Sequence, residues 1–307
     1  MYNESMSQKF EIRVPASSAN LGPAFDSLAI ALDLWNECSF SVEGDSLQIE
    51  LEGEGAESLA TDDSNLIFVS FKAALEQAGQ TLPEGIRIQC HNRIPLNSGL
   101  GSSAAALVSG LIAGNAFAGN PFSSDQLLQL AAEIEGHADN AAAALLGGLV
   151  LVTKIDNKFT TQQLPFEELS CVLLIPDIEI STAQARAALD QQVELTAAVA
   201  NIGHAMALIK AFELGAISAL REHMRDQLHQ PQRLKLIPGA QEALSAANQA
   251  GAAVALSGAG PGLIAFVEDG REKAITETMR APFAEQGIHT RQYLLKTSGQ
   301  GAKLEVS

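Results

Sequence analysis

The stretch Pro95-Leu96-Asn97-Ser98-Gly99-Leu100-Gly101-Ser102-Ser103-Ala104-Ala105-Ala106 decides the fold of this chain, because it joins a strand-like run to a long helix of small residues. The strand is expected over 86–91 and the helix over 102–118. Gly99 and Gly101 allow positive φ and let a ligand approach the backbone closely. Free N–H groups at a helix start, together with the helix dipole, form an anion site. A phosphate chain is the expected anion, with a serine hydroxyl able to bind its metal ion.

A simple helix cap is the alternative to a phosphate site in this stretch. Ser102 or Ser103 can be an ordinary N-cap, since serine caps are common. The P-loop pattern is absent because no Gly-Lys-Ser or Gly-Lys-Thr follows, and the dinucleotide fingerprint is absent because its third glycine is missing. The sequence Gly-Leu-Gly-Ser-Ser alone therefore leaves both a helix cap and a phosphate site open.

The composition excludes several classes of partner. The chain has 307 residues, 47% of them hydrophobic, and a formal net charge of −17. Such a length suggests one large or two ordinary domains. The negative charge disfavours nucleic acid and anionic membranes, which require a basic face. It does not exclude ATP, which local N–H groups and a divalent cation can hold.

Several segments bear on where the protein resides. The first ten residues lack the apolar core of a signal peptide. The longest apolar run, 141–152, is too short and too interrupted by glycine to span a bilayer. The cysteines, Cys38, Cys90 and Cys171, are far apart without metal-binding spacing, and reduced core thiols are expected. A cytoplasmic location is therefore expected.

The expected elements indicate an α+β protein of two sandwich-like domains, because helices and strands alternate but hairpin-like pairs are also present. Residues 15–26 are expected to be an irregular turn, and 43–46 a hairpin turn between strands 29–42 and 47–51. The polar stretch 154–170 is the candidate boundary, giving domains 1–165 and 166–307. Further helices are expected over 65–78, 123–135, 140–146, 182–189, 194–212, 216–225, 240–249 and 271–285, with further strands over 10–14, 149–153, 171–175, 252–256, 262–267 and 291–295 and a loop over 231–238.

A second group of chemically active side chains lies in 133–140. It holds three carboxylates, an imidazole and an amide: Glu133, Glu135, His137, Asp139 and Asn140. A solvated acidic helix end is the simpler interpretation in so acidic a protein. A carboxylate facing the phosphate loop would instead complete a magnesium site with a serine hydroxyl.

Two other features suggest a ligand site. The stretch 256–262 has three glycines between apolar strands, which indicates either a tight turn or a loop closing over the phosphate loop. Arg186 follows Thr182 by four residues on an expected helix, so both share one face. Arg186 and Arg233 would bind a substrate carboxylate if they converged, although a lone arginine is usually a surface residue.

Taken together, these segments resemble the homoserine kinases of the GHMP kinase superfamily. The stretch 95–106 is similar to the superfamily's ATP-binding motif. Alanine stands at 24, 138, 143 and 259 where that family commonly has glycine, proline, proline and serine, and none of these changes removes a charged ligand. The other matching segments, in the family's order, are 15–26, 65–67, 135–140, 182–186, 229–233 and 257–261.

The resemblance implies a two-domain GHMP kinase fold, with a ribosomal-S5-domain-2-like N-terminal domain and a ferredoxin-like C-terminal domain. It implies an enzyme that transfers the ATP γ-phosphoryl group to the side-chain hydroxyl of L-homoserine, giving O-phospho-L-homoserine for threonine biosynthesis. Mg²⁺ would accompany ATP, and a homodimer is expected by analogy.

The resemblance also implies residue roles. Asp26 would position the attacking hydroxyl, and the absence of lysine from the motif segments argues against full proton abstraction. Ser103 and Glu135 would hold Mg²⁺, with Glu133 as the alternative carboxylate. The residues expected at the nucleotide are Asn65, Pro95, Leu96, Asn97, Ser98, Gly99, Leu100, Gly101, Ser102, Ser103 and Ala104. Those expected at homoserine are Asn20, Asp26, His137, Asp139, Asn140, Thr182, Arg186, Arg233 and Gly260.

Two rival functions remain open from the sequence. A GHMP kinase acting on mevalonate or a sugar would share the phosphate loop, but the two arginines and His137 suit an amino acid better. A non-catalytic binding protein on the same fold is the other rival. Intact Ser103, Glu135 and Asp26 argue against such a degenerate site.

Overall fold

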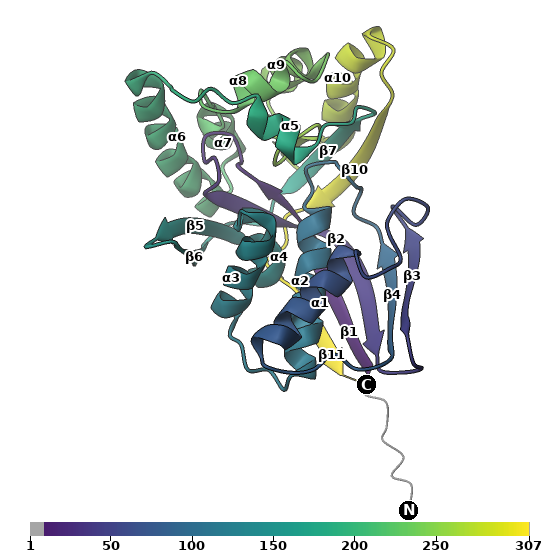
Figure 1. Cartoon of the computed structure of the whole chain (residues 1–307). Helices are drawn as coiled ribbons and strands as arrows, with labels where there is room; N and C mark the ends of the chain where they lie inside the picture. Colours follow the sequence, from purple (N-terminus) through teal and green to yellow (C-terminus); the bar gives the residue numbers. More distant parts are fainter. Residues whose placement is uncertain (1–8, 307) are drawn as a thin grey trace, which may run out of the picture.

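The first sheet carries the N-terminal half of the chain. The computed structural model describes residues 9–306 (Figure 1). Neighbouring strands of this sheet follow the order β11-β1-β2-β4-β3, while β5 pairs with β2 and with β6. The strands are β1 (Lys9–Ala19), β2 (Leu28–Ser41), β3 (Leu47–Gly53), β4 (Ile86–Asn92), β5 (Leu149–Ile155), β6 (Lys158–Leu164) and β11 (Lys303–Val306).

Four helices cover one face of this sheet: α1 (Leu66–Gln77), α2 (Ser102–Phe117), α3 (Ser124–Glu135) and α4 (Asp139–Leu146) (Figure 1). Helix α2 is buried over most of its surface because its alanine and glycine side chains let other elements approach closely. A Cβ added at Gly110 would lie 2.2 Å from the backbone oxygen of Ile67 in α1. The small residues of α2 therefore set the spacing of the two central helices.

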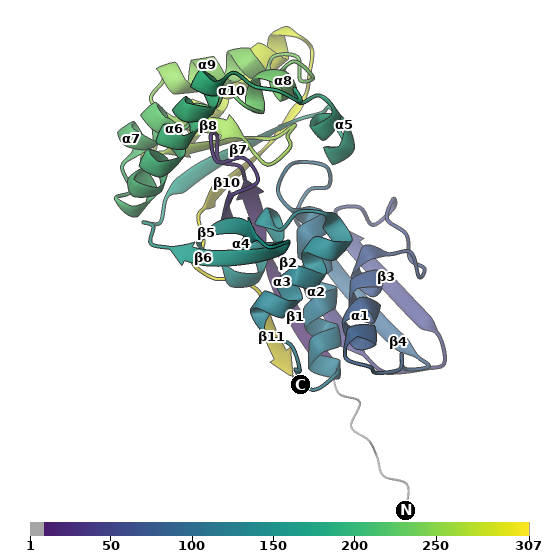
Figure 2. The ribbon, with the colours of Figure 1, turned by 60° about the vertical axis from the view of Figure 1, so that its left-hand side comes forward.

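The second sheet has four strands, β7 (Ser170–Pro176), β8 (Ala253–Leu256), β9 (Leu263–Val267) and β10 (Thr290–Lys296), in the order β10-β7-β9-β8. Figure 2 shows this sheet and its helices beyond one end of the first sheet. The helices are α5 (Thr182–Ala187), α6 (Leu195–Glu213), α7 (Ile217–His223), α8 (Gln230–Leu234), α9 (Ala240–Gln249) and α10 (Glu272–Glu285).

The α+β class is confirmed, but several local expectations are wrong. Residues 43–46 do not form a hairpin turn, because β4 lies between β2 and β3, and β3 pairs with β4 in parallel. Residues 15–19 continue β1, since Pro15 pairs with Trp35 and, after a register shift, 16–19 pair with 29–32 of β2. Residues 230–234 form a short helix and not a loop. The polar stretch 154–170 contains strand β6, whose backbone pairs with β5.

The chain end returns to the first sheet. β11 pairs antiparallel with β1, so 303–306 pack with the N-terminal half. The domain division after residue 165 stays a prediction, and the last strand crosses it. The partner of a short polar strand such as 303–306 cannot be predicted from its own residues, because strand pairing depends on tertiary context.

The three cysteines are free and buried. Cys38 and Cys90 lie opposite each other on β2 and β4, with their sulfur atoms 3.1 Å apart. Burial raises the pKa of the Cys171 thiol to about 12. Thiols in such surroundings resist ionisation and behave as small apolar groups.

Helix α6 has an exposed apolar face. Within 9–306 it is the one helix whose length and composition would allow a membrane crossing, and a single such helix is weak evidence of a membrane span. Leu195, Val199, Ile202 and Met206 are each at least 60% exposed. Their spacing of four, three and four residues places them in one stripe along the helix.

Candidate active site

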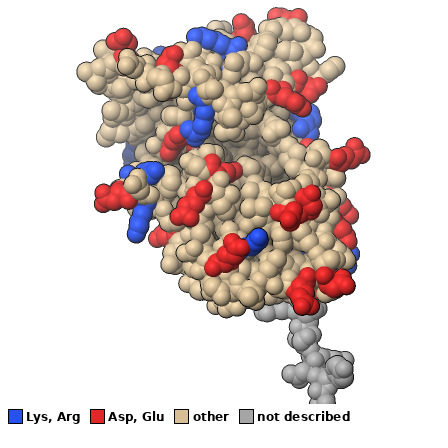
Figure 3. Space-filling model, in the orientation of Figure 1, with Lys and Arg blue, Asp and Glu red and all other residues tan. Residues whose placement is uncertain are grey.

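A cleft of about 950 Å³ lies between the two halves of the molecule. Segments of the first half that line it include the loop before α2 and the turn before β2, and the second half contributes α5, α8 and the loop between β8 and β9. Figure 3 shows the hollow between the upper and lower parts of the molecule. The cleft therefore needs segments that are far apart in sequence.

The start of α2 forms the floor of the cleft. Gly101 is the N-cap residue, has φ of +69°, and makes no side-chain cap bond. Ser102 and Ser103 therefore lie inside the first turn and are not the N-cap. The first-turn N–H groups, left without a side-chain cap, face a cavity at the positive end of the helix dipole. This geometry favours the anion site over the ordinary serine cap.

The glycine-rich loop between β8 and β9 lies directly against this phosphate loop. Ser257 Oγ donates a hydrogen bond to the Gly99 carbonyl at 2.7 Å. A Cβ at Gly99 would lie only 2.0 Å from the Ser257 carbonyl oxygen. Asn20 Nδ2 also donates to the Gly258 carbonyl at 2.8 Å. The glycines thus allow the backbones of the two loops to touch. This contact agrees with the prediction from sequence that the stretch 256–262 closes over the loop before α2.

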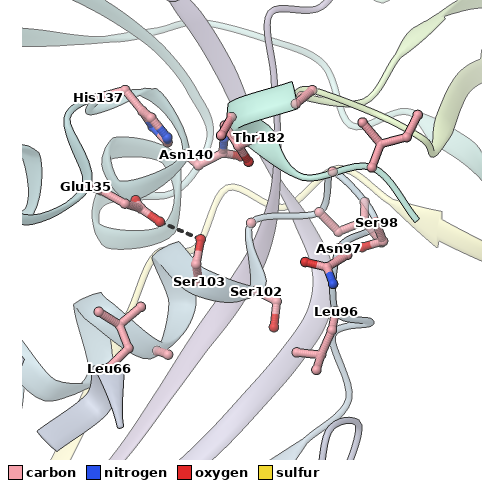
Figure 4. A pocket seen from close by; sticks show the side chains of 18 of the residues that line it. Leu66, Leu96, Asn97, Ser98, Ser102, Ser103, Glu135, His137, Asn140 and Thr182 are labelled. Carbon is pink, nitrogen blue, oxygen red and sulfur yellow. Dashed lines mark hydrogen bonds between the residues drawn. The ribbon is translucent and has the colours of Figure 1, made fainter. Parts of the chain in front are cut away.

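Ser103 and Glu135 meet above the start of α2. The Ser103 hydroxyl donates to Glu135 Oε1 (Figure 4). Glu135 Oε2 is buried and has no hydrogen-bond partner in the protein. Burial is the main cause that raises the pKa of this carboxyl. Glu133 is exposed and does not line the cleft.

The Ser103–Glu135 pair fits Mg²⁺ held mainly by phosphate and water. The unpartnered oxygen of Glu135 is a hard ligand beside the anion site, next to a hydroxyl oxygen. No cluster of three or more His, Cys, Asp or Glu side chains able to hold a metal ion occurs within the part of the chain that the structure describes. A magnesium site of one carboxylate, substrate phosphates and water needs no such cluster.

Asp26 and Arg186 form a bidentate ion pair across the cleft. Arg186 Nη1 and Nη2 donate to the Asp26 oxygens at 3.0 and 2.9 Å. The hydrogen bonds with Asp26 raise the pKa of the Arg186 guanidinium. Asp26 has φ of +53°, a left-handed conformation that turns its side chain toward α5. The pair joins the N-terminal turn to the second half.

A second charged group lies beside this pair. His137 Nδ1 is 3.2 Å from Asp139 Oδ1, and the Asp139 carboxylate raises the pKa of His137. Asn140 Oδ1 accepts a hydrogen bond from the Ser17 hydroxyl at 3.0 Å. Figure 4 shows His137, Asn140 and Glu135 on the same side of the cleft. Their arrangement offers both charge and hydrogen bonds to a small zwitterion.

Phe25 lies against both arginines of the cleft. The guanidinium carbons of Arg186 and Arg233 lie 5.8 and 5.0 Å from its ring centroid. Two cations close to one aromatic ring are attracted to its π electrons, which offsets part of their repulsion. Phe25 was not expected at the site, although it immediately precedes Asp26 in the matched motif.

Most residues predicted for the site line this one cleft. Pro95 and Ala104 do not line the cleft; they flank the lining segment 96–103 on either side. Asn65 lines it but also caps α1, with Oδ1 accepting from the Ile67 N–H at 3.0 Å. The predicted residues that line it are Asn20, Asp26, Asn65, Leu96, Asn97, Ser98, Gly99, Leu100, Gly101, Ser102, Ser103, Glu135, His137, Asp139, Asn140, Thr182, Arg186, Arg233 and Gly260.

Sequence reasoning missed a wall near the start of α1. Ser58, Leu59, Ala60 and Ser64 line the cleft near Asn65, as does Leu66 of the matched segment 65–67. The first four come from a polar connection before α1 with no motif of its own. Only the proximity of Asn65 in sequence points to them.

Comparisons with known proteins agree on one family. The GHMP kinases N terminal domain matches residues 65–148, and the GHMP kinases C terminal domain matches residues 208–285. A homoserine kinase of Carboxydothermus hydrogenoformans is 41% identical over 292 residues, with 95% of each chain covered. A homoserine kinase of Synechocystis is 38% identical over 300 residues, covering 96% of this chain and 98% of that one.

Solved structures show the same fold. The crystal structure of a homoserine kinase from Cytophaga hutchinsonii aligns with a TM-score of 0.86 and 31% identity, over 99% of this chain and 100% of that chain. A mevalonate kinase of L. major aligns with a TM-score of 0.70 at 16% identity, over 94% of this chain and 96% of that chain. The second likeness concerns the fold alone.

Proposed function

The chain belongs to the homoserine kinases of the GHMP kinase family, and on that premise we propose how its cleft transfers the γ-phosphoryl group of ATP to the side-chain hydroxyl of L-homoserine. The product is O-phospho-L-homoserine, an intermediate of threonine biosynthesis. One observation carries the proposal. Two arginines suited to a carboxylate share a cleft with the uncapped start of α2, which suits phosphate.

The phosphate end of the cleft comprises residues 96–103. Its N–H groups would neutralise charge on the phosphates, because they point from the first turn of α2 into the cleft. Ser103 and Glu135 would hold Mg²⁺, which supplies charge neutralisation for phosphoryl transfer. The unpartnered Oε2 atom of Glu135 supports this assignment over Glu133. The wall 58–66 would then face the nucleoside.

The acceptor end would hold homoserine by its charged groups. Arg186 and Arg233 would bind the carboxylate, and Asp139 the ammonium group. His137, Asn140, Asn20 and Thr182 would complete the hydrogen bonds. Phosphoryl transfer depends mainly on alignment and charge stabilisation, so a strong base is not required.

Asp26 would orient the substrate and the arginine, and would not act as a free base. Both its carboxylate oxygens accept hydrogen bonds from Arg186. A carboxylate held in this way has fixed lone-pair directions, which suits positioning of a hydroxyl or ammonium group.

ADP release by the purified protein with Mg·ATP tests the function. L-homoserine, D-homoserine, mevalonate and galactose would be compared at equal concentration. Turnover with L-homoserine alone is expected. Turnover with mevalonate or galactose instead would overturn the acceptor assignment, and ATP binding without turnover on any acceptor would indicate a non-catalytic protein.

The exposed stripe of α6 would be the contact between two copies of the chain in the cytoplasm. In an antiparallel pair of α6 helices, Leu195 would face Met206 of the partner subunit, and Val199 would face Ile202 of the partner subunit. Both pairings satisfy the same twofold axis between residues 200 and 201, so the stripe is complementary to itself. The net charge of −17 disfavours an anionic membrane as the alternative occupant.

A further inference from the structure

Arg233 is an unusual ligand because it is almost completely buried. It is 2% exposed and yet lines the cleft. Its Nε donates to the Ala185 carbonyl at 3.3 Å, and its Nη1 donates to the Gly258 carbonyl at 3.3 Å. In the described residues, Nη2 makes no hydrogen bond within the protein. One side of the guanidinium is therefore anchored, and the other is available to a ligand.

The third anchor of Arg233 is a histidine. His229 Nδ1 lies 3.3 Å from Arg233 Nη1. His229 is fully buried and does not line the cleft, so it cannot touch a substrate there. Its ring stacks on Phe25, the aromatic residue that both arginines contact, with ring centroids 5.0 Å apart.

The other ring nitrogen decides the tautomer of His229. Nε2 lies 2.8 Å from the Gly22 carbonyl oxygen. A carbonyl oxygen only accepts, so Nε2 must carry the proton. In a neutral ring Nδ1 then has a lone pair, which can accept from Arg233 Nη1.

The charges around His229 agree with a neutral ring. Burial is the main cause that lowers its pKa below the usual 6.5. Asp226, 3.6 Å from Nε2, opposes this shift of the pKa, and so does Asp26, whereas Arg233 at Nδ1 lowers the pKa further. Asp226 is occupied by the backbone N–H groups of 228–230, at 2.6 to 3.0 Å. From α6, neutral Asn201 packs against Asp226.

We propose that His229 is a positioning residue, whose Nδ1 accepts from Arg233 and thereby turns the free donors of Arg233 toward the substrate carboxylate. This inference rests on the proposed function, in which Arg233 binds that carboxylate. A proton on Nδ1 would remove the acceptor and place two positive charges side by side. Affinity for homoserine should therefore fall as the pH drops through the pKa of His229.

Two substitutions separate the two ring nitrogens. His229→Gln places an amide group near Nε2, which keeps a donor for Gly22 and removes the acceptor at Nδ1. His229→Asn places an amide oxygen near Nδ1, which keeps the acceptor for Arg233. His229→Gln should raise the homoserine KM by about tenfold or more, as expected for loss of a hydrogen bond to a charged group. The ATP KM of His229→Gln should stay within about twofold of the wild-type value. The homoserine KM of His229→Asn should lie much closer to the wild-type value than that of His229→Gln.

The control is His289→Gln, because His289 is exposed and far in sequence from every segment of the cleft. It should leave both KM values unchanged. Equal homoserine KM values for the Asn and Gln variants, or equal rises in the two substrates' KM values, would overturn the inference.

The pH profile gives a second readout. In the wild type, the homoserine KM should rise as the pH falls below 6.5, because His229 becomes protonated. This rise in KM at acid pH should be absent from His229→Asn. The titration of His137, whose pKa is raised, should remain in both proteins. Persistence of the rise in KM at acid pH in His229→Asn would contradict the inference.

Nitrogen NMR of the wild-type histidines gives an answer even if both variants fail to fold. One imidazole should be neutral and protonated at Nε2, with that proton protected from exchange. Absence of such a ring would overturn the inference. Failure of the wild type to turn over L-homoserine would instead contradict the proposed function, and the NMR result would still decide the tautomer.

Discussion

The two arginines of the cleft share one aromatic ring but have different surroundings. Arg186 is partly exposed and pairs with the carboxylate of Asp26, which comes from the other half of the molecule. Arg233 is buried against two carbonyl groups and a histidine. Desolvation is the main cause that lowers the pKa of Arg233, although arginine stays charged in proteins. The buried cation is therefore the stronger attractor for a substrate anion.

Replacing Arg233 should weaken the binding of homoserine and not that of ATP. Arg233→Ala should raise the homoserine KM by about 100-fold, as expected for loss of two charge-assisted hydrogen bonds, while the ATP KM changes by less than about threefold. Steady-state kinetics with each substrate varied in turn measure this. Arg225→Ala is the control, since Arg225 is exposed and outside the cleft. Equal rises in the KM values for homoserine and ATP would contradict the assignment of Arg233 to the homoserine pocket.

The choice between two nearby glutamates can be tested directly. Glu135→Gln should raise the Mg²⁺ concentration needed for half-maximal rate by about tenfold or more, because an amide is a weaker magnesium ligand than a carboxylate. Glu133→Gln should leave it unchanged, since Glu133 is exposed outside the cleft. Titration of free Mg²⁺ at fixed ATP measures this, with Mg²⁺-dependent nucleotide fluorescence as a readout independent of turnover. The reverse result would move the metal site to Glu133.

Between elements, the fold depends on backbones that touch. The loop between β8 and β9 packs on the loop before α2 through glycines, and α2 packs on α1 in the same way at Gly110. Side chains larger than hydrogen would separate these segments. The loop before α2 is therefore packed against the second half through direct backbone contact at Gly99.

A pair of glycine substitutions separates backbone strain from steric clash. Gly79 and Gly99 both have positive φ, +68° and +78°, but a Cβ at Gly79 meets nothing within 4 Å. Gly79→Ala should cost about 1 kcal/mol of unfolding free energy and leave the ATP KM unchanged. Gly99→Ala should also raise the ATP KM by about tenfold or more, because its Cβ would push Ser257 away.

Chemical denaturation and nucleotide titration measure the two effects. Ser257 donates to the Gly99 carbonyl, so its displacement should disturb the anion site directly. A Gly99→Ala protein with normal ATP affinity would show that contact between the two loops is not needed for nucleotide binding.

As a whole, the molecule joins two sheets around one cleft. β11 pairs with β1 and Thr297 bridges to Leu32, so the C-terminal segment ties the second half back to the first. Acidic side chains are spread over the face shown in Figure 3, while basic side chains are fewer. An exposed apolar helix on such a surface favours contact with another protein over an anionic membrane.

The assembly prediction concerns this helix. Ile202→Glu should convert a dimer into a monomer, because a buried charge at the proposed twofold contact would have no partner. Light scattering after gel filtration measures the mass. Ile155→Glu is the matched control, since Ile155 on β5 is 59% exposed but far from α6 in sequence. A wild-type monomer, or a dimer that survives the change, would contradict the α6 contact.

The sequence by itself determined the family, most of the elements and the position of the glycine-rich loop before α2. Hydrophobic period, caps and glycines act locally, so the capping box of Ser123 and Gln126 and the helix over 102–117 follow from neighbouring residues. The matched motifs also indicate which polar side chains belong to a cleft, including Asp26 and Arg233.

Only the tertiary structure decided how those side chains meet. The order of strands β2, β4 and β3, the return of β11, the pairing of Asp26 with Arg186 and the contact of His229 with Arg233 all join distant or buried groups. Such contacts depend on packing and desolvation, which no local pattern encodes. The buried tautomer of His229 follows from a carbonyl group more than 200 residues away, at Gly22.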